Sequence, residues 1–492
     1  MEEKMKILMV SSEAVPYAKT GGLADAVSAL AITLSNMGYD VKIVIPRYYK
    51  IDRSQLLQLQ GPMGVPAGQV EAWTAVYKTT MPGCDKLEVY FIDHEGCFGR
   101  DGIYGVPGET DFHDNPYRFA LLCHGAFQLC RKIGWYPDII HAHDWSAALA
   151  LSLLKHVYRW QDFGGTAGVI SIHNLGYQGQ YSKDSFPALG MDWGLYYGAS
   201  IEHDGGINFL QTGIASAEMV TTVSPTYAEE IKTAEGGFGM DGLLRARGDA
   251  VRGILNGCDT KAWNPEIDKK IPATYSAKNM KGKTICKAEL QKRFGLEQNP
   301  DIPVFGVVTR LADQKGIAEL FAPSYGCLYS LCANMNIQFV VLGSGEAWCE
   351  NEINVLQSKL PNFRAYIGYN DELSHLIEAG SDFFVMPSHY EPCGLNQIYS
   401  MIYGTLPIVR RTGGLADTVQ NYNESTGEGT GFMFDAITPS ALYNTVGWAV
   451  YAYYNKKDHI KAMRLRGMKS VFSWEDAAKK YLEVYDEALR RK

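Results

Sequence analysis

The chain has 492 residues, of which 46% are hydrophobic and 20% are charged, and its formal net charge is −8. This length predicts two domains, and this composition is typical of a globular protein in water. The negative charge argues against bulk binding of nucleic acid. No apolar run reaches the roughly 18 residues that a membrane span requires, so we expect no membrane partner.

The ten cysteines include no CxxC pair and have no regular spacing. Neither a zinc site nor a disulfide framework is therefore indicated, and free thiols are typical of a reducing compartment. The charged start of the chain runs into an apolar segment at Ile7, which leaves no room for a signal or transit peptide. These features predict a cytoplasmic protein.

The first half of the chain reads as a series of short apolar strands separated by helices, which predicts a doubly wound α/β domain. Polar residues follow four of these strands, and the carboxyl ends of parallel strands form the ligand crevice in such folds. They are His141 to Asp144, His173-Asn174, Ser224-Pro225 and Asn256-Gly257. The predicted strands span residues 6–12, 41–45, 87–92, 138–140, 169–172, 220–223 and 251–255.

The motif His141-Ala-His143-Asp144 could hold a metal, but a third ligand would have to come from elsewhere in the chain. We favour a buried, hydrogen-bonded histidine, with Asp144 facing a cleft and no metal.

The hexapeptide TGGLAD occurs twice, at residues 20–25 and 412–417, each time after a basic residue and before a predicted helix. In the first copy Lys19 adds a positive charge to the backbone N–H groups of Gly21 and Gly22, an arrangement that suits an anion. An ordinary strand-to-helix turn is the alternative for one copy alone. The repeat favours two Rossmann-like halves, each directing a Gly-Gly helix start toward a shared cleft.

Three loops of the second half follow predicted strands at residues 303–308, 383–386 and 406–409. The first carries Arg310 and Lys315, which could bind a diphosphate. The second carries Glu391, and the third carries Arg410 and Arg411 before Thr412 and Gly413. A carboxylate for hydroxyl groups beside donors for phosphate predicts a sugar-nucleotide site.

Three further features complete the prediction. Tyr369 ends a predicted strand at residues 365–369, where it could stack on a base or belong to the core. The tail from Ser473 begins with a capping box and has apolar residues at helical spacing, namely Trp474, Ala478, Tyr481, Val484, Tyr485 and Leu489. The turn-rich segment at residues 256–270 predicts the domain linker.

Eight motifs are together similar to the bacterial glycogen synthase and plant starch synthase family: KTGGLADAV (19–27), HAHDW (141–145), IHNLGYQG (172–179), VSPTYAEEI (223–231), LNGCD (255–259), RLADQKG (310–316), EPCGLNQ (391–397) and RRTGGLADTV (410–419). The resemblance implies a GT-B fold, in which two Rossmann-like domains face each other across a deep cleft. It places the domains at 1–258 and 259–472, with the helix at 473–492 crossing back to the N-terminal domain.

The resemblance also implies an activity: transfer of glucose from ADP-glucose to the non-reducing 4-OH of an α-1,4-glucan, with retention of configuration and without a metal or other cofactor. It implies catalytic roles for Asp144, His173, Arg310, Lys315 and Glu391. The residues expected to bind substrate are Lys19, Gly21, Gly22, Asn256, Tyr369, Cys393, Gly394, Leu395, Thr412 and Gly413.

Retention without an obvious nucleophile fits a front-face mechanism, in which the departing phosphate takes the proton of the acceptor. Double displacement through Glu391 is the rival. Three positions depart from the family pattern: Ser146 replaces a usual His, Asn396 replaces a usual Thr, and Tyr399 replaces the second Glu of the Glu-x7-Glu pattern of related enzymes. The alternative functions are another GT-B transferase and a non-catalytic glucan- or nucleotide-binding protein, and the motifs leave the choice between ADP and UDP open.

Overall fold

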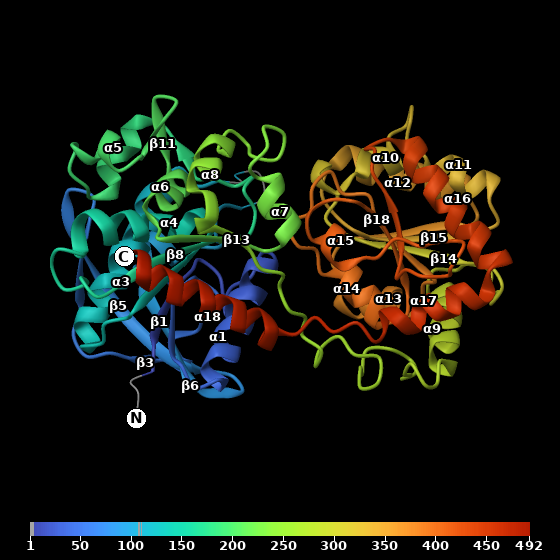
Figure 1. Ribbon diagram of the computed structural model, residues 1–492, viewed down its shortest axis with the longest axis horizontal. Coiled ribbons are helices and arrows are strands. Elements are labelled where there is room, and N and C mark those ends of the chain that lie inside the picture. The colour runs from blue at the N-terminus through green and yellow to red at the C-terminus, as the bar shows by residue number, and fades with distance from the viewer. Residues whose placement is uncertain (1–3, 107–108, 110) are drawn as a thin grey trace. The chain divides into compact units, whose positions relative to one another are not determined.

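The computed structural model describes residues 4–106, 109 and 111–492, and the chain divides into two compact units. Unit 1 is the chain up to Gly257 together with Trp474–Lys492, and unit 2 is Cys258–Ser473. Each unit is an α/β body in which helices pack on a sheet (Figure 1). The division falls within the predicted linker, one residue from the expected boundary.

The main sheet of unit 1 has the strand order β13-β12-β8-β7-β1-β2-β6-β5-β3, and β4 pairs with β5. Strands from β13 to β6 are parallel, and β7 and β8 are buried throughout, as strands covered on both faces are. The strands are β1 Lys6–Val10, β2 Asp40–Pro46, β3 Leu57–Gln58, β4 Met63–Ala67, β5 Val70–Met81, β6 Cys84–Asp93, β7 Ile139–His143, β8 Ala167–Ile172, β12 Met219–Thr222 and β13 Val251–Gly253.

Helices and a small antiparallel sheet of β10, β11 and β9 complete unit 1. These elements are α1 Gly22–Asn36, α2 Glu95–Phe98, α3 Asn115–Ile133, α4 Asp144–Leu153, β9 Gln180–Tyr181, α5 Leu195–Gly198, β10 Glu202–His203, β11 Gly206–Asn208, α6 Phe209–Ser216, α7 Pro225–Glu230 and α8 Asp241–Arg247.

The C-terminal helix α18 (Trp474–Arg491) packs on α1, β8 and β12 of unit 1, as predicted (Figure 1). Its buried face is Ala477, Ala478, Tyr481, Val484, Tyr485 and Ala488, a spacing that places these side chains on one stripe. Trp474 and Leu489, which were expected on this face, are only partly buried. Arg491 adds an ion pair of 2.6 Å with Asp249 near the end of the helix.

Unit 2 is built on a parallel sheet with the order β16-β15-β14-β17-β18-β19. Its strands are β14 Val304–Val308, β15 Gln338–Gly343, β16 Phe363–Ile367, β17 Phe383–Met386, β18 Leu406–Arg410 and β19 Phe432–Phe434. Its helices are α9 Lys281–Arg293, α10 Ile317–Phe321, α11 Leu328–Asn334, α12 Ala347–Lys359, α13 Asp371–Gly380, α14 Asn396–Ile402, α15 Gly413–Thr418, α16 Pro439–Asn455 and α17 Lys457–Gly467.

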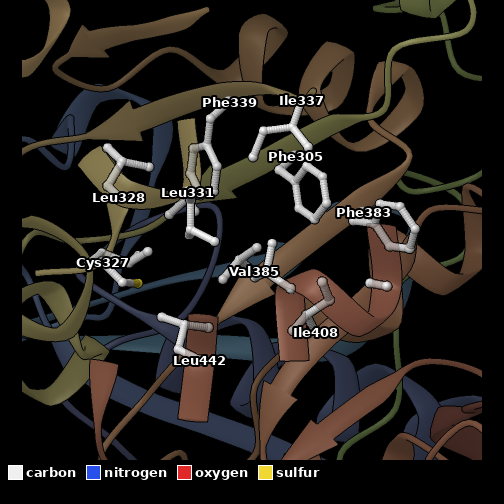
Figure 2. Packing of buried hydrophobic residues seen from close by; sticks show 14 of the residues in the cluster. Phe305, Cys327, Leu328, Leu331, Ile337, Phe339, Phe383, Val385, Ile408 and Leu442 are labelled. Carbon is white, nitrogen blue, oxygen red and sulfur yellow. The ribbon is translucent and has the colours of Figure 1, made fainter. Parts of the chain in front are cut away.

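Alternate residues of β14, β15 and β17 enter two separate cores. Phe305, Phe339 and Phe383 lie in the core on one face of the sheet, and Figure 2 shows them together with Leu331 and Ile408. Their neighbours in sequence, such as Val304, Val340 and Phe384, lie in the core on the opposite face. Burial on both faces holds the strands rigidly, and this fixes the positions of the first residues of the loops at their carboxyl ends.

Candidate active site

Lys315 and Glu391 meet at the carboxyl edge of the unit 2 sheet. Lys315 lies in the short 3-10 turn after β14, and its Nζ is 2.6 and 2.8 Å from the two carboxylate oxygens of Glu391, in the loop after β17. Ser388 Oγ donates a further hydrogen bond of 2.9 Å to Glu391. The carboxylate is therefore almost fully buried, paired and fixed in orientation.

The loop of Glu391 is also joined to the second TGGLAD segment. Gly414 N–H donates to the carbonyl oxygens of Glu391 and Pro392. Gly413 has a φ of +43°, and a Cβ there would lie 2.0 Å from the carbonyl oxygen of Glu391. Only glycine permits this approach, so Gly413 holds the two loops together. Thr412 is the N-cap residue of α15 and is buried beside them.

A small cavity of about 100 Å³ lies between these loops. Lys315, Ser388, Glu391, Gly394 and Leu395 line it, together with Asn396 and apolar residues of β14 and β17. Asn396 Nδ2 donates to the carbonyl oxygen of Val308 at 2.7 Å, which ties the start of α14 to the end of β14. The amide that replaces the usual Thr thus makes a backbone contact at the cavity wall. Cys393, just before Gly394, is buried.

Arg310 follows β14 and is exposed, and no carboxylate of the described residues pairs with it. Arg410 and Arg411 differ from the prediction. Arg410 donates to the carbonyl oxygens of His389 and Asp435, and Arg411 forms an ion pair of 2.8 Å with Asp435. These two guanidinium groups hold the loops of unit 2, whereas Arg310 has its donors available for a ligand.

Tyr369 lies two residues beyond the end of β16, and 87% of its surface is exposed. The alternative that it belongs to the core is therefore wrong. The strand itself begins at Phe363, two residues before the predicted start.

Tyr399, which occupies the second position of the Glu-x7-Glu pattern, has a packing contact. Its ring stacks on Trp263 with a centroid distance of 4.0 Å, and Trp263 stacks on His375 at 3.8 Å. The aromatic side chain at position 399 thus has a structural contact within unit 2.

In unit 1, the first TGGLAD loop is held by a residue that the sequence prediction missed, Glu13. Its carboxylate accepts hydrogen bonds from the backbone N–H and Oγ1 of Thr20 and from the hydroxyl of Tyr104. Glu13 is buried just after β1. An acidic residue directly after an apolar strand was the signal that could have identified it.

Lys19, Gly21 and Gly22 lie on the open side of this loop. Lys19 is exposed and pairs with Asp25 at 2.8 Å. A Cβ placed on Gly21 or Gly22 would meet no heavy atom of the described residues within 4 Å. The two TGGLAD copies therefore use their glycines differently: the second packs against another loop, and the first leaves space beside the start of α1.

Ser146, another departure from the family pattern, is hydrogen-bonded to the residues that hold the same loop. Its Oγ donates to Ser12 Oγ at 2.7 Å, and Ser12 lies 2.7 Å from the hydroxyl of Tyr104, which donates to Glu13. Because Tyr104 uses its single proton on Glu13, Ser12 donates to Tyr104. Ser146 is thus the first member of a chain of hydrogen-bonded hydroxyl groups that ends at Glu13.

Asp144 begins α4 directly after β7, and its φ of +55° is uncommon for a residue with a side chain. Its Oδ1 accepts a hydrogen bond of 2.7 Å from the backbone N–H of His173. Burial raises the pKa of Asp144 to about 7, although the N–H groups of His173 and Asn174 oppose this shift. The structure thus joins Asp144 and His173, which were predicted together at this strand edge.

His141 and His143 lie two residues apart on β7, and both are buried. The sequence predicted only one buried histidine in this motif, so the number of buried histidines was underestimated. His141 uses both ring nitrogens, Nδ1 with the hydroxyl of Tyr485 and Nε2 with Ser171. A ring with two protein partners cannot also bind a metal without losing one of them, so His141 is not available as a metal ligand.

His143 Nδ1 lies 3.1 Å from Nε2 of His173, and His143 Nε2 is buried without a partner among the described residues. An acceptor without a partner costs less than a buried N–H without one, so we infer that His143 donates from Nδ1. His173 then accepts at Nε2 and carries its proton on Nδ1. Burial lowers the pKa of His173 to about 4, so the ring is neutral at pH 7.

Asn256, near the end of unit 1, is almost fully buried. Its side-chain oxygen has no hydrogen-bond partner within the described parts of the chain. Most buried polar atoms have a partner, so this oxygen is a candidate acceptor for a ligand.

Two family models match the chain: "Starch synthase catalytic domain" at residues 6–246 and "Glycosyl transferases group 1" at residues 289–460. The chain is 58% identical to "Glycogen synthase" of Treponema denticola, with 99% of both chains covered. It is 45% identical to "Glycogen synthase 1" of Geobacter metallireducens, over 100% of this chain and 97% of the relative. The solved catalytic domain of starch synthase IV from Arabidopsis thaliana, bound to ADP and acarbose, is 30% identical and has a TM-score of 0.88 over 99% of this chain and 100% of that chain.

Proposed function

This chain belongs to the glycogen and starch synthase family of glycosyltransferases, and from that premise we propose that it elongates an α-1,4-glucan from ADP-glucose. The family makes it a GT-B hexosyltransferase that uses a nucleotide-sugar donor and a glucan acceptor. The choice of ADP-glucose, attack by the non-reducing 4-OH and retention of configuration complete the proposal. ADP is the leaving group.

The pairing of Lys315 with Glu391, on the strand-end loop that also carries the exposed and unpaired Arg310, is the observation that supports this function best. Cleavage of the sugar–phosphate bond builds negative charge on the departing diphosphate. Fixed cations stabilise that charge more in the transition state than in the ground state, so they accelerate the reaction. Lys315 is already held in place by Glu391, so it need not reorganise during the step.

In this proposal Glu391 orients Lys315 and the transferred glucose and does not attack the anomeric carbon. Both of its oxygens already accept hydrogen bonds from Lys315, and one also accepts from Ser388. A carboxylate bound in this way is a weakened nucleophile. The departing phosphate oxygen would take the proton of the acceptor hydroxyl on the same face of the sugar, which gives retention.

We assign the remaining residues by their positions. Asp144, His173 and Asn256 would contact the transferred glucose, with His173 donating from Nδ1 and Asn256 accepting at its free oxygen. Lys19, Gly21 and Gly22, together with Thr412, Gly413 and the backbone from Cys393 to Leu395, would contact the nucleotide sugar. Tyr369 would stack on the base, because its ring is exposed.

We further propose that transfer needs no metal, because cationic side chains supply the charge that the diphosphate requires. We assign the enzyme to the cytoplasm. All ten cysteines are free, buried thiols, a state that is typical of a reducing compartment. In the described part of the chain, no helix is both long and apolar enough to cross a bilayer.

Release of the nucleoside diphosphate from ADP-glucose and UDP-glucose, with and without a maltooligosaccharide and in the presence of EDTA, tests the proposal. We expect release of ADP only when the acceptor is present, with lengthening of the oligosaccharide. A preference for UDP-glucose would overturn the donor assignment, and activity lost in EDTA would overturn the metal-free mechanism. Trapping of a glucosyl adduct on Glu391 would replace the front-face step with double displacement.

A further inference from the structure

Unit 2 contains a second, larger cavity of about 720 Å³, which has the volume of a typical small-molecule site. It lies beside α17, the end of α16 and the segment before α9. None of its lining residues lines the small cavity at Glu391. The proposed glucosyl transfer leaves this cavity without a role.

Its charge is strongly positive, although the whole chain carries a formal charge of −8. Lys278, Lys457 and Lys461 line it, all three are exposed, and none forms an ion pair with another described residue. Lys457 and Lys461 are four residues apart on α17, so their like charges repel each other on one face of the helix. An anion in the cavity would relieve this repulsion.

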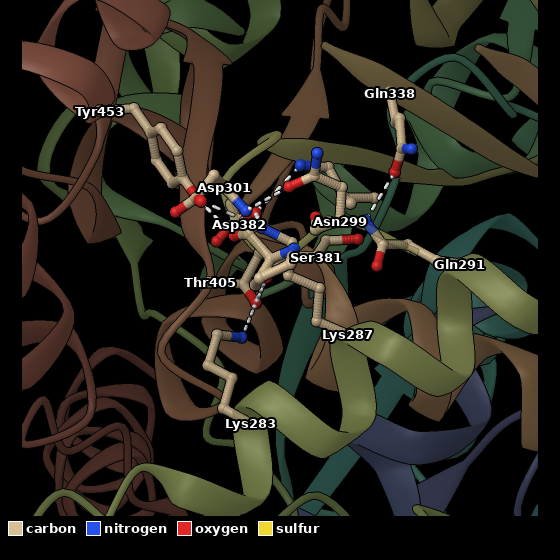
Figure 3. A network of polar contacts seen from close by, with 12 residues as sticks. Lys283, Lys287, Gln291, Asn299, Asp301, Gln338, Ser381, Asp382, Thr405 and Tyr453 are labelled. Carbon is tan, nitrogen blue, oxygen red and sulfur yellow. Dashed lines mark hydrogen bonds and ion pairs between the residues drawn. The ribbon is translucent and has the colours of Figure 1, made fainter. Parts of the chain in front are cut away.

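The wall behind these lysines is held by a buried ionic network (Figure 3). Arg464, which also lines the cavity, donates to Asp382 at 2.5 Å, and Lys287 pairs with Asp382 at 2.8 Å. Lys287 also lies 3.1 Å from the hydroxyl of Tyr453, another lining residue. Arg464 is therefore fixed in position, and because Asp382 is shared by Arg464 and Lys287, this group keeps a positive charge that adds to that of the lysines.

The remaining polar lining suits hydroxyl groups. Asp301 has an exposed carboxylate that forms no ion pair with a described residue, and Asn279 contributes an exposed amide. The ring of Tyr454 adds an aromatic surface on which a sugar ring can pack. A bare anion would be repelled by Asp301, whereas a ligand with hydroxyl groups can donate hydrogen bonds to it.

We propose that this cavity binds a phosphorylated sugar. Its phosphate contacts Lys457, Lys461 and Lys278, and its hydroxyl groups donate to Asp301. The residues of this site differ from those that bind the donor in the proposed function. The two proposals can therefore be tested independently.

Isothermal titration of the full-length protein with glucose 1,6-bisphosphate at low salt tests the site. We expect binding that weakens about tenfold or more in Lys457→Ala/Lys461→Ala and that weakens with added salt, because the contacts are charged. Lys269→Ala/Lys359→Ala is the matched control, since both lysines are exposed and unpaired among described residues but lie outside the cavity. Arg310→Ala tests for binding at the other site. Both control variants should bind like the parent protein.

Asp301→Asn separates a sugar phosphate from a simple anion. We expect this variant to bind glucose 1,6-bisphosphate more weakly and inorganic phosphate no more weakly than the parent protein does. The proposal is overturned if the parent shows no binding, if Arg310→Ala abolishes binding while Lys457→Ala/Lys461→Ala keeps it, or if inorganic phosphate binds as tightly as the sugar bisphosphate.

Discussion

At the scale of single residues, Lys315 and Glu391 are 76 positions apart in sequence, and their charged atoms lie within 2.8 Å of each other. Removing one partner of a buried ion pair leaves the other without compensation. The two side chains therefore depend on each other for their position, and a change at either one acts on both.

We predict that Glu391→Gln lowers kcat by about 10²- to 10³-fold, the usual effect of losing one fixed electrostatic group at a reaction centre. The neutral amide cannot hold the Lys315 ammonium in place, so the cation moves away from the leaving group. ADP release from ADP-glucose measures the effect. Glu350→Gln, an exchange of a glutamate outside the small cavity, is the control. A Glu391→Gln enzyme with unchanged kcat would contradict the assigned role.

We predict that the pH profile of kcat/KM has an inflection near pH 7 that belongs to Asp144, because burial raises its pKa to about 7. The carboxylate form accumulates as the pH rises through this value, so activity that depends on an acceptor at Asp144 increases with pH.

Asp144→Asn should remove this inflection and lower the activity. Asn tolerates the positive φ at this position, so the variant should fold normally. An inflection near pH 7 that survives in Asp144→Asn would show that another group titrates there.

At the scale of elements, α18 is distant in sequence from β7 but contributes the hydroxyl of Tyr485 to His141, at 2.9 Å. The centroids of the His141 and His143 rings are 4.1 Å apart, and His143 is hydrogen-bonded to His173. The C-terminal helix therefore takes part in fixing the histidines beneath the candidate site of unit 1.

We predict that Tyr485→Phe destabilises unit 1 by about 1–3 kcal/mol, because it leaves a buried ring nitrogen of His141 without its partner. Chemical unfolding monitored by tryptophan fluorescence measures this loss. Tyr451→Phe removes a hydroxyl from a tyrosine that is 45% exposed, and it should leave stability within about 0.5 kcal/mol of the parent. Equal effects of both substitutions would contradict the role of the Tyr485 hydroxyl.

At the scale of the whole molecule, stability depends on groups that stay neutral when folded. Burial lowers the pKa of His141 to about 3 and that of His173 to about 4, and it lowers the pKa of His143 well below its usual value. In the unfolded chain these rings take up protons below about pH 6.5. Acidification from that pH toward pH 4 therefore favours unfolding.

We predict that the free energy of unfolding falls as the pH drops from 6.5 to about 4, with each neutral histidine contributing up to about 1.4 kcal/mol per pH unit. Asp144 offsets the contribution of one histidine, because its carboxylate takes up a proton in the folded state over much of the same pH range. His141→Gln should reduce the slope by the contribution of one histidine, as measured by denaturant unfolding at several pH values. An unchanged slope would show that His141 does not titrate in this way.

The sequence by itself determined the two Rossmann-like halves, the return of the last helix and the family, because apolar strand periodicity and loop motifs are local patterns. It also identified the strand-end loops that carry Arg310, Lys315 and Glu391, since parallel strands place such loops at one edge.

Only the tertiary structure decided which of these side chains are available to a ligand. Arg410 and Arg411 are paired within unit 2 and Arg310 is not, and Glu13 acquires its role from Thr20 and Tyr104. Hydrogen bonds and ion pairs between distant segments depend on packing, so a local pattern can mark a residue such as Glu13 as a candidate but does not encode its partners.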